Sequence, residues 1–367
     1  VISGNSTIPG ASTVHFDEIS KDKIFKSIDK IKGMKTLIKE SYVSLKNRLG
    51  RVPLLYDFYE NQEIDPLVIV REYKTYYAFM QAMEKDKYKN SLNEQEKLTL
   101  EYLSKTILSG VRPDELAILS QLLYRDHIGV ADFIKEYQKT YGIKISTSQV
   151  NEAIQVLQGH FVSTEQKALV TNASVLTAAE AEYQKFRQID ILENDPSGMI
   201  RRLKSYTERL AHIQFCTQVE DIIKVGIARY KDKYFPGRIV DSPFVLYEKY
   251  SRRDVSLLMN CGKDLSSIMY GMKRIEDDVF IFITYHKEES QDEKNYVDGK
   301  PDYADAFEDD LIFKWDSQIG KGLDSSYMKD VLEAERKHLL VKKSDAETSF
   351  YYMGQFDIIE SVDSQKE

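Results

Sequence analysis

Basic and aromatic side chains that could bind a nucleic acid gather between residues 247 and 356 of this chain. Arg252 and Arg253 come shortly after Tyr250, at the start of a short helical segment with the sequence VSLLMN. Two neighbouring guanidinium groups can bind one phosphate group through several charge-assisted hydrogen bonds. The arrangement therefore predicts a phosphate contact at these three residues.

A second candidate site surrounds Trp315, the only tryptophan of the chain. The side chains of Ser317 and Gln318 follow it closely and supply a hydroxyl and an amide group. An aromatic wall beside such groups suits a nucleobase or sugar that is held out of its stack. A buried core tryptophan with a satisfied N–H group is the alternative interpretation.

Further candidate binding residues stand where short apolar segments end, because loops held by strands commonly display binding groups. A strand is expected to end at Tyr270 and Gly271, where a glycine lets a ligand approach the backbone closely. The apolar segment VFIFIT is followed at once by Tyr285, His286 and Lys287. All five residues are therefore predicted to contribute to nucleic-acid binding.

Motifs for catalysis are missing from the sequence. The chain has no GxxxxGK[ST] motif, no CxxC pair, no HExxH and no GxSxG, and its six histidines lack partners at metal-ligand spacing. We therefore expect no catalytic residue, no metal site and no cofactor in this chain.

A metal-dependent nuclease that uses Asp302 and Asp310 is a weaker alternative. Such enzymes combine two acidic residues and a lysine around Mg²⁺, but Lys314 is preceded by apolar residues and the acid-x-Lys element is missing. A solvated acidic loop over residues 288–310 is the preferred interpretation.

The elements that must position these residues are of two kinds. Helical periodicity dominates the sequence before residue 234, and short apolar strands separated by turn residues dominate after it. This order predicts an α+β protein, in which a multi-helical N-terminal arm precedes a β-rich domain. We expect the following division: 1–14 tail or linker, 15–110 helical domain, 111–179 winged-helix-like unit, 180–235 helical connector and 236–367 β-rich domain.

The winged-helix-like unit is predicted from three helices that precede two β-prone segments, ALVTN and SVLTA, at residues 168–178. Its third helix carries Gln149, Asn151, Gln155 and Gln158 but neither arginine nor lysine. A helix without cations neutralises phosphates poorly, so we favour a structural or protein-contacting unit over a sequence reader.

Helix patterns give boundaries that a structure can test. The expected helices cover residues 34–49, 68–83, 93–108, 115–124, 130–141, 199–213 and a segment that starts at Ser146-Thr147. Gly50 is expected to end the first of these helices, and Pro66 to open the second.

The composition of the 367 residues places the chain in a broad class. The net charge is −8, and residues 286–367 hold 11 Lys and Arg against 21 Asp and Glu. No apolar run suggests a membrane span and no leader suggests secretion, so we expect a cytoplasmic protein with Cys216 and Cys261 as free, buried thiols. An acidic protein can still carry a local basic face.

Several ordered motifs resemble one family. They are HFDEISKDKIFKSI, LGRVPLLYDFYENQEIDP, YSRRDV, YGMK, FITYHK, FKWDSQ and HLLVKKSDAETSFYYMGQF. Together they are similar to the C-terminal region, a domain of unknown function, of bacterial superfamily II DEAD/DEAH-box helicases, some of which also carry a phospholipase D-like nuclease domain. The resemblance implies that ATP and Mg²⁺ would bind to a helicase core outside this chain, and that residues 1–14 follow that core.

The β-rich domain also resembles PUA/SRA-like modules and the sulfur-binding modules of McrA-type restriction enzymes. The shared order is Tyr-x-Arg-Arg-Asp, a Tyr-Gly strand, an apolar strand, an acidic loop and a late strand that leads to Phe-x-Tyr-x-Gly. This resemblance implies a β-barrel-type domain that binds DNA, including modified DNA. The chain lacks the HNH nuclease of those enzymes.

The leading hypothesis is a non-catalytic accessory region of a helicase-like protein that binds DNA in restriction or phage defence. Its expected partners are DNA and the helicase motor in cis, without a membrane. The alternative is a protein-interaction or autoregulatory module for that motor.

Overall fold

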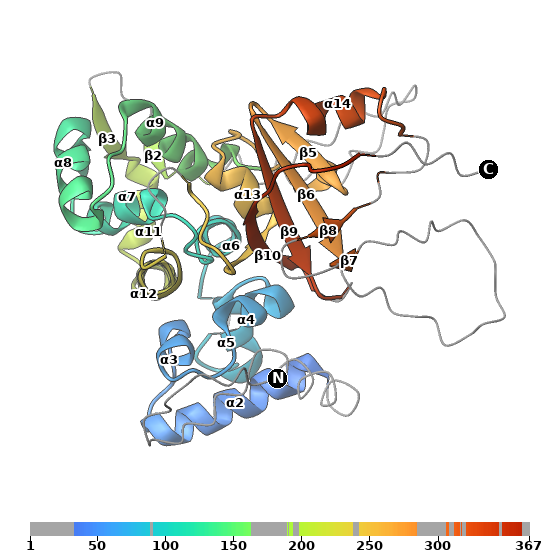
Figure 1. The fold of residues 1–367 in the computed structure, drawn as a ribbon. Helices are drawn as coiled ribbons and strands as arrows, with labels where there is room; N and C mark the ends of the chain where they lie inside the picture. The colour runs from blue at the N-terminus through green and yellow to red at the C-terminus, as the bar shows by residue number, and fades with distance from the viewer. Residues whose placement is uncertain are drawn as a thin grey trace, which may run out of the picture. The chain divides into compact units, whose positions relative to one another are not determined.

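The computed structural model describes residues 33–88, 91–162, 189, 191–193, 198–237, 242–284, 306–307, 312–315, 317, 321–344 and 347–361. The chain divides into two compact units, one that ends at Tyr73 and one that begins at Lys74, which we call the N-terminal unit and the main unit. The described elements are helices and small β-sheets, so the expected α+β class is confirmed (Figure 1).

The described part of the N-terminal unit consists of α2 (Met34–Leu49), α3 (Leu55–Glu60) and α4 (Pro66–Tyr73). Helix α2 covers the predicted residues and ends at Gly50, whose φ of 66° is the left-handed conformation that glycine adopts readily. Pro66 opens α4, because the first helical position needs no N–H donor. Both predicted boundaries are confirmed.

The single helix predicted for residues 68–83 is wrong, because the chain breaks at Lys74 and Thr75. Lys74 has a φ of 69°, and the Thr75 hydroxyl accepts a hydrogen bond from the backbone N–H of Ala78 at 3.0 Å. The hydroxyl thereby caps the start of a new helix, α5 (Tyr76–Met83). The two helices belong to different units, which periodicity alone does not reveal.

The main unit contains most of the described helices. They are α5, α6 (Glu94–Thr106), α7 (Asp114–Leu122), α8 (Val130–Tyr141), α9 (Thr147–Gln155), α11 (Lys204–Leu210), α12 (Ile213–Arg229), α13 (Arg252–Leu258) and α14 (Ser326–Glu333), with short helical turns η1 (Val156–His160), η2 (Tyr230–Tyr234) and η3 (Ser266–Ile268). The helices predicted for 93–108, 115–124, 130–141 and the segment from Ser146-Thr147 correspond to α6 to α9.

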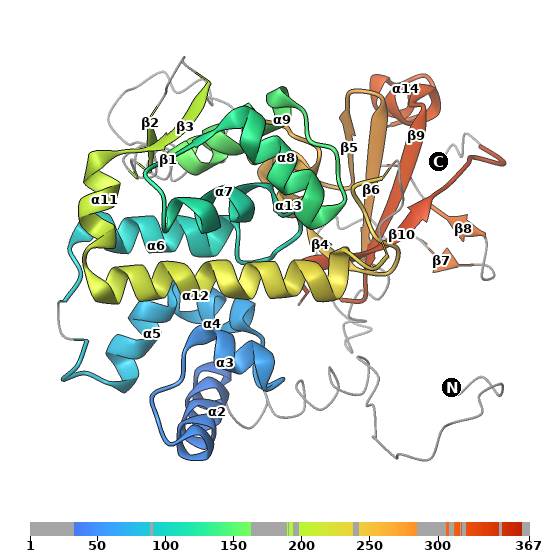
Figure 2. The same ribbon diagram turned by 90° about the vertical axis from the view of Figure 1, so that its left-hand side faces the viewer.

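Helix α12 packs along α6 and α7 (Figure 2). The close approach requires a residue without a side chain at Gly226, where a Cβ atom would lie 2.7 Å from Leu116 Cδ2 and 2.9 Å from the carbonyl oxygen of Ile107. The same holds at Gly110, where a Cβ atom would lie 2.3 Å from the carbonyl oxygen of Gly226. Two glycines therefore set the helix spacing in the core of this unit.

A small antiparallel sheet joins α7, α8 and α9. Strand β1 (His127–Gly129) lies between α7 and α8, and β2 (Leu192–Glu193) and β3 (Met199–Arg202) follow α9 in the sequence. The strand order is β1-β3-β2, with Ile128 paired to Ile200. We call the segment from α7 to β3 the helix-hairpin segment.

The helix predicted for residues 199–213 is wrong in its first turn, because Met199–Arg202 forms the central strand β3. Its edges pair with β1 and β2, and Gly198, with a φ of 78°, makes the turn that leads into it. The β-prone segments at residues 168–178, where the hairpin was expected, lie outside the described residues.

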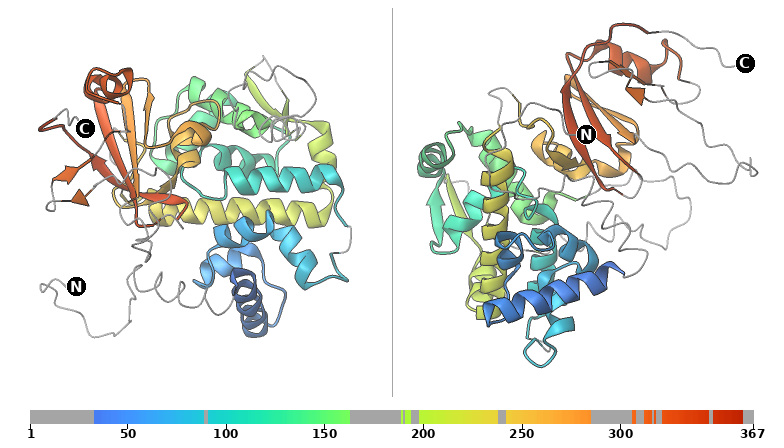
Figure 3. Two further views of the ribbon diagram at one scale, coloured as in Figure 1. Left: turned by 90° about the vertical axis from the view of Figure 1, so that its right-hand side faces the viewer. Right: turned by 60° about the horizontal axis from the view of Figure 1, so that its bottom comes forward.

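The β-rich part of the main unit is a five-stranded sheet with the order β4-β10-β9-β6-β5, shown in orange and red in Figure 3. Its strands are β4 (Lys249–Ser251), β5 (Met272–Ile275), β6 (Asp278–Thr284), β9 (Arg336–Lys342) and β10 (Ser349–Gln355). Only β6 and β9 run parallel, and α14 lies between them in the sequence. A separate hairpin pairs β7 (Ala306–Phe307) with β8 (Phe313–Lys314).

Both faces of the sheet are buried, as β6 shows. Its successive side chains point to opposite faces, and six of its seven residues are buried. Val279, Ile281 and Ile283 belong to an apolar cluster with Val331 of α14. Phe280 and Phe282 lie on the other face, which is also the face of α13. Within the described residues the sheet is open and forms no closed barrel.

Two further expectations concern the whole chain. No described helix reaches the length and apolar content that crossing a lipid bilayer requires. Cys216 and Cys261 are free thiols, as predicted, but they are half-buried rather than fully buried.

Candidate nucleic-acid interface

One end of the five-stranded sheet collects basic and aromatic side chains. The pairings of Ser251 with Ser349 and of Thr284 with Lys342 bring the ends of β4, β6 and β9 together with the start of β10. We call this surface the basic sheet end. It consists of Arg252, Tyr270 and Lys342 on one face of the sheet, and of Lys249, Lys343 and Tyr351 on the opposite face.

Arg252 is the centre of the basic sheet end. Its guanidinium carbon lies 5.0 Å from the ring centroid of Tyr270, 5.5 Å from that of Phe282 and 5.1 Å from that of Phe350. A guanidinium group within about 6 Å of an aromatic face is attracted by the ring electrons. The three rings therefore hold the side chain in one place.

The start of α13 fixes the backbone of Arg252. The hydroxyl of Ser251 accepts a hydrogen bond from the N–H of Asp254 at 3.1 Å, and the Asp254 carboxylate accepts one from the N–H of Ser251 at 2.8 Å. This reciprocal cap is a common helix start. Arg252 is the first residue of the helix that this cap starts.

The guanidinium of Arg252 has no carboxylate partner among the described residues, and its buried Nε has no hydrogen-bond acceptor there. Burial lowers the pKa of this side chain, because the charged form loses contact with water. An arginine that is held by rings alone keeps its N–H groups available for an anionic or polar ligand.

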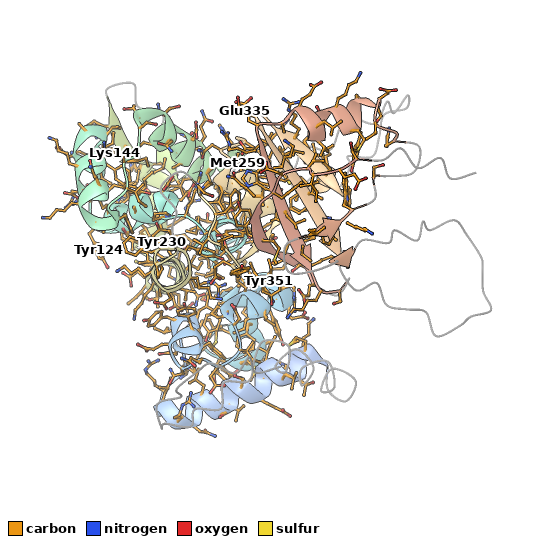
Figure 4. All side chains as sticks on the ribbon, viewed as in Figure 1. Tyr124, Lys144, Tyr230, Met259, Glu335 and Tyr351 are labelled. Carbon is orange, nitrogen blue, oxygen red and sulfur yellow. The ribbon has the colours of Figure 1, made fainter. Side chains whose placement is uncertain are left out.

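Lysines extend the positive charge along the same end of the sheet. Lys249 Nζ lies 4.5 Å and Lys343 Nζ 5.2 Å from the ring centroid of Tyr351, which is labelled in Figure 4. Lys342 Nζ lies 5.5 Å from the Phe350 ring and donates a hydrogen bond to the carbonyl oxygen of Glu347. Lys342 therefore lies on the same face of the sheet as Arg252, whereas Lys249 and Lys343 lie with Tyr351 on the opposite face, because Tyr351 pairs with Val341 of the apolar cluster.

Tyr270 and Gly271 lie at this end, as the predicted site requires, but they precede a strand rather than end one. Gly271 has a φ of 73° and its carbonyl oxygen accepts a hydrogen bond from Phe282 N–H at 2.8 Å, which leads the chain into β5. Tyr270 is 62% exposed. An exposed ring beside a guanidinium can stack on a nucleobase.

Arg253 occupies a different environment from its neighbour. Its guanidinium pairs with Asp264 and donates hydrogen bonds to Thr106 Oγ1 at 3.0 Å and to the carbonyl oxygen of Phe161 at 2.9 Å. Burial acts to raise the pKa of Asp264, but the charge of Arg253 and the hydrogen bonds of Ser266 outweigh it, so this pKa is lowered. These contacts occupy Arg253 within the main unit.

Tyr250 is fully buried, and its hydroxyl accepts a hydrogen bond from the backbone N–H of Val245 at 2.8 Å. Burial raises the pKa of the phenol beyond its ordinary value. The ring packs against Phe244 at 5.2 Å and Tyr234 at 5.4 Å between ring centroids. The contacts of Tyr250 are those of a core residue.

The predicted site at Trp315 lies on the other face of the sheet. The half-buried indole stacks on Tyr327 at 6.4 Å between ring centroids and packs against the apolar cluster beneath α14. Ser317 Oγ donates a hydrogen bond to the carbonyl oxygen of Lys321 at 2.8 Å. The structure therefore does not bring Trp315 and Arg252 to one surface.

Several predicted positions cannot be placed. Tyr285, His286, Lys287 and Gln318 lie outside the described residues, as do Asp302, Asp310 and the predicted acidic loop of residues 288–310 apart from β7. The described strand β6 ends at Thr284, directly before the first three of them and beside the basic sheet end. No group of acidic, histidine and cysteine residues suited to a metal ion occurs in the described part of the chain.

The predicted third helix, α9, begins at Ser146, whose side chain accepts a hydrogen bond from Gln149 N–H. Asn151 and Gln155 are exposed on it, and Gln158, in the following turn, donates a hydrogen bond to the carbonyl oxygen of Leu192 at 3.4 Å. The described helix thus presents amides and no cations.

A buried polar network was missed in the sequence. His338 Nε2 lies 2.7 Å from Asp278 Oδ1, and His338 Nδ1 lies 2.9 Å from the hydroxyl of Tyr352. A carboxylate can only accept, so the neutral ring donates to Asp278 and accepts from Tyr352. Arg336 completes the network with two hydrogen bonds to Asp278, at 2.8 and 2.7 Å.

A signal for this network is present in the sequence but weak. His338 is the polar residue within the strand sequence KHLLVK, and its ring stacks on Phe280 with 4.6 Å between centroids. Only the pairing of β6 with β9 shows that Asp278 stands beside it. His338, Asp278 and Tyr352 are buried, whereas the side chain of Arg336 is 46% exposed, so the buried part of the network has the contacts of a structural element.

Two family models match the chain. The first, described as Domain of unknown function (DUF8090), matches residues 38–233, which is more than half of the chain, and the second, described as Domain of unknown function (DUF3427), matches residues 244–367. No curated protein matches the chain. The basic sheet end lies entirely within the second match.

Proposed function

We propose that this chain, which belongs to the DUF8090 family of domains of unknown function, binds nucleic acid as an accessory region of a helicase-like protein. The observation that carries the proposal is the guanidinium of Arg252. It lies against the rings of Tyr270, Phe282 and Phe350, without a carboxylate partner among the described residues.

The surroundings of Arg252 suit a single strand or an exposed base. The ammonium group of Lys342 beside Phe350 attracts the phosphate backbone, Lys249 and Lys343 add positive charge on the opposite face of the same sheet end, and exposed Tyr270 offers a stacking surface. Proteins that bind single strands combine a cationic groove with aromatic stacking, at about 1–3 kcal/mol per stacked base. The acidic net charge of −8 does not oppose this, because binding depends on the local surface.

The finer parts of the proposal have different supports. The order α7-β1-α8-α9-β2-β3, with the sheet order β1-β3-β2, supports a winged-helix-like helix-hairpin segment. The SRA-like head, the modified DNA ligand, the helicase motor in cis and the role in restriction or phage defence rest on the sequence resemblance alone.

The experiment is a fluorescence anisotropy titration of the full chain with short single-stranded, double-stranded and modified DNA. We expect saturable binding that weakens steeply between about 50 and 200 mM salt, because displaced counterions favour the complex. Arg252→Ala should weaken binding by about 1–3 kcal/mol. Lys329→Ala, an exposed lysine of α14, is the matched control and should leave the affinity unchanged.

The results that contradict the proposal are clear. Binding that does not depend on salt, or no binding to any of these DNAs, removes it. Equal affinity of the Arg252→Ala variant and the unchanged chain removes the basic sheet end as the interface.

A second candidate is a protein-interaction module, which the surface of α9 favours. Asn151 and Gln155 are exposed there, and the described helix carries no arginine or lysine. Uncharged amides suit a protein surface better than a phosphate backbone. Retention of the chain by an isolated helicase core, after nuclease digestion, would support this candidate, and no retention would dismiss it.

A further inference from the structure

A cavity lies where the two family matches meet, away from the basic sheet end. It has a volume of about 90 Å³ and is lined from one side by Asp114, Tyr137, Lys144 and Gln149, and from the other by Pro243 and Asn260. We call it the junction cavity. One water molecule needs about 15 Å³ of this kind of volume, so the cavity has room for about six groups of the size of a water molecule. This room suits the six atoms of one six-membered ring.

Buried ionic side chains build the floor of the junction cavity. The Arg112 guanidinium, 8% exposed, pairs with Glu115 and donates hydrogen bonds to the carbonyl oxygen of Leu257 at 2.7 Å and to Asn260 Oδ1. Asn260 is held with a φ of 51° at the end of α13. Because Asn260 Oδ1 accepts from Arg112, the Nδ2 group of this amide remains as a donor for a ligand.

Asp114 supplies an acceptor that no described group uses. The hydroxyl of Tyr137 donates to Asp114 Oδ1, whereas Oδ2 lies 4.0 Å from Arg112 Nε, beyond hydrogen-bond distance. Asp114 is only 9% exposed and lines the cavity. A carboxylate oxygen that the protein leaves without a donor can accept a hydrogen bond from a ligand N–H group.

Asn260, Gln149 and Lys144 also line the cavity and carry donor groups. Gln149 Oε1 accepts hydrogen bonds from the N–H and the hydroxyl of Ser146, at 2.9 and 3.0 Å, which leaves its NH₂ group without a partner in the described structure. Lys144 is exposed and has no ion pair there, and Figure 4 labels it beside α8. The cavity thus offers one acceptor, two amide donors and a cation.

Tyrosine rings form the apolar walls. Tyr137, Tyr230 and Tyr234 line the junction cavity together with Ile143, Ile145 and Leu258. Figure 4 labels Tyr230 at the end of α12, and its ring lies 5.8 Å from that of Tyr141. Flat walls with polar groups at the rim are typical of sites for planar heterocycles.

We propose that the junction cavity binds a cytosine nucleotide. The exocyclic amino group of cytosine would donate to Asp114 Oδ2, as acidic side chains accept from this group in other complexes. Its ring nitrogen and carbonyl oxygen would accept from the amides of Asn260 and Gln149. The phosphate would lie at the exposed ammonium of Lys144.

Uracil provides the discriminating comparison. It carries a carbonyl oxygen in place of the amino group, and two acceptors would then face each other at Asp114. A good bidentate contact with a base makes the affinity for the right base about 5-fold to 150-fold higher than that for the wrong base. The inference does not depend on the basic sheet end, because the two sites share no residue.

The experiment is isothermal titration calorimetry of the full chain with cytidine monophosphate, uridine monophosphate and cytidine. We expect saturable binding of cytidine monophosphate, with uridine monophosphate weaker by about 5-fold to 150-fold. Lys144→Ala should weaken cytidine monophosphate but not cytidine, and Lys139→Ala, another exposed lysine near α8's end, should change neither. Asp114→Asn should remove the preference for cytosine.

A separate arm distinguishes a free nucleotide from a base within a strand. A short deoxycytidine strand is titrated into the Arg252→Ala variant, in which the basic sheet end no longer contributes. Binding of cytidine monophosphate assigns a free nucleotide. If the chain binds the strand but not the monophosphate, and Asp114→Asn abolishes the strand binding, the ligand is a base within a strand. Binding of neither ligand, or equal binding of the cytosine and uracil forms, overturns the inference.

Discussion

The guanidinium of Arg112 donates a hydrogen bond to the carbonyl oxygen of Leu257 at 2.7 Å. Arg112 belongs to the span of the first family match, and Leu257 to that of the second. The same guanidinium pairs with Glu115, which is 1% exposed. Burial acts to lower the pKa of Arg112, but Glu115 and Asp114 outweigh it and raise this pKa, so the arginine stays charged. One buried cation therefore joins the two families' domains.

Removing Arg112 alone should destabilise the main unit strongly. Arg112→Met leaves the Glu115 carboxylate buried without a counter-charge, which costs about 3–5 kcal/mol. Urea unfolding followed by circular dichroism measures the change. The double variant Arg112→Met with Glu115→Leu is the control, because replacing both charges by apolar groups is often neutral. Equal losses in the single and double variants would contradict the ion-pair explanation.

Gly226→Ala should destabilise the packing of α12. The added methyl group would lie 2.7 Å from Leu116 Cδ2 and 2.9 Å from the carbonyl oxygen of Ile107, so the helices must separate. Overpacking of this kind costs about 1–3 kcal/mol. The control is Gly33→Ala, where no heavy atom lies within 4 Å of the new Cβ. A thermal melt of each variant compares them, and similar midpoints would show that the helices yield without cost.

Local signals in the sequence predicted the elements that depend on neighbouring residues. Gly50, Pro66 and the cap at Ser146 act within one turn of helix, and the structure has each helix boundary as expected there. The helix over residues 68–83 was wrong for the opposite reason. Its break at Lys74 depends on which unit each half packs into, and periodicity carries no such information.

The candidate site shows the same limit. The sequence placed Arg252 and Arg253 together, because adjacent residues are close in any fold. It could not show that Arg252 lies on aromatic rings from β6 and β10, whereas Arg253 is paired with Asp264. Nor could it show that Trp315 packs on the opposite face of the sheet, since that depends on strand order.

The His338 network should make stability fall at mildly acidic pH. Burial lowers the pKa of His338 below its ordinary value of 6.5, although Asp278 acts against this. The unfolded chain then binds a proton that the folded chain does not, so stability is complete above about pH 6.5 and declines below it, by at most about 1.4 kcal/mol per pH unit for one proton. Asp278, whose pKa is also lowered, contributes only at still lower pH.

Urea unfolding between neutral pH and mildly acidic pH tests this expectation. His338→Gln removes the titrating group and should flatten the dependence in that range, at the cost of lower stability at neutral pH. His127→Gln, at an exposed histidine of β1, is the matched control and should retain the slope of the unchanged chain. A slope that survives the loss of His338 would assign it to other groups.

Arg252 and Arg253 should separate binding from stability. Arg253→Ala leaves Asp264 buried without its counter-charge and removes the hydrogen bonds to Thr106 and Phe161, so we expect a loss of about 3–5 kcal/mol of unfolding free energy. Arg252→Ala removes only contacts with aromatic rings, worth about 0.5–2 kcal/mol, but it should lower DNA affinity. Arg252→Lys keeps the positive charge but lacks the planar guanidinium group. Compared with Arg252→Ala, it should therefore restore the salt dependence of binding more fully than the affinity. Urea unfolding and anisotropy titrations of the three variants compare their stability with their DNA affinity. If the loss of affinity follows the loss of stability and not the change at Arg252, the interface lies elsewhere.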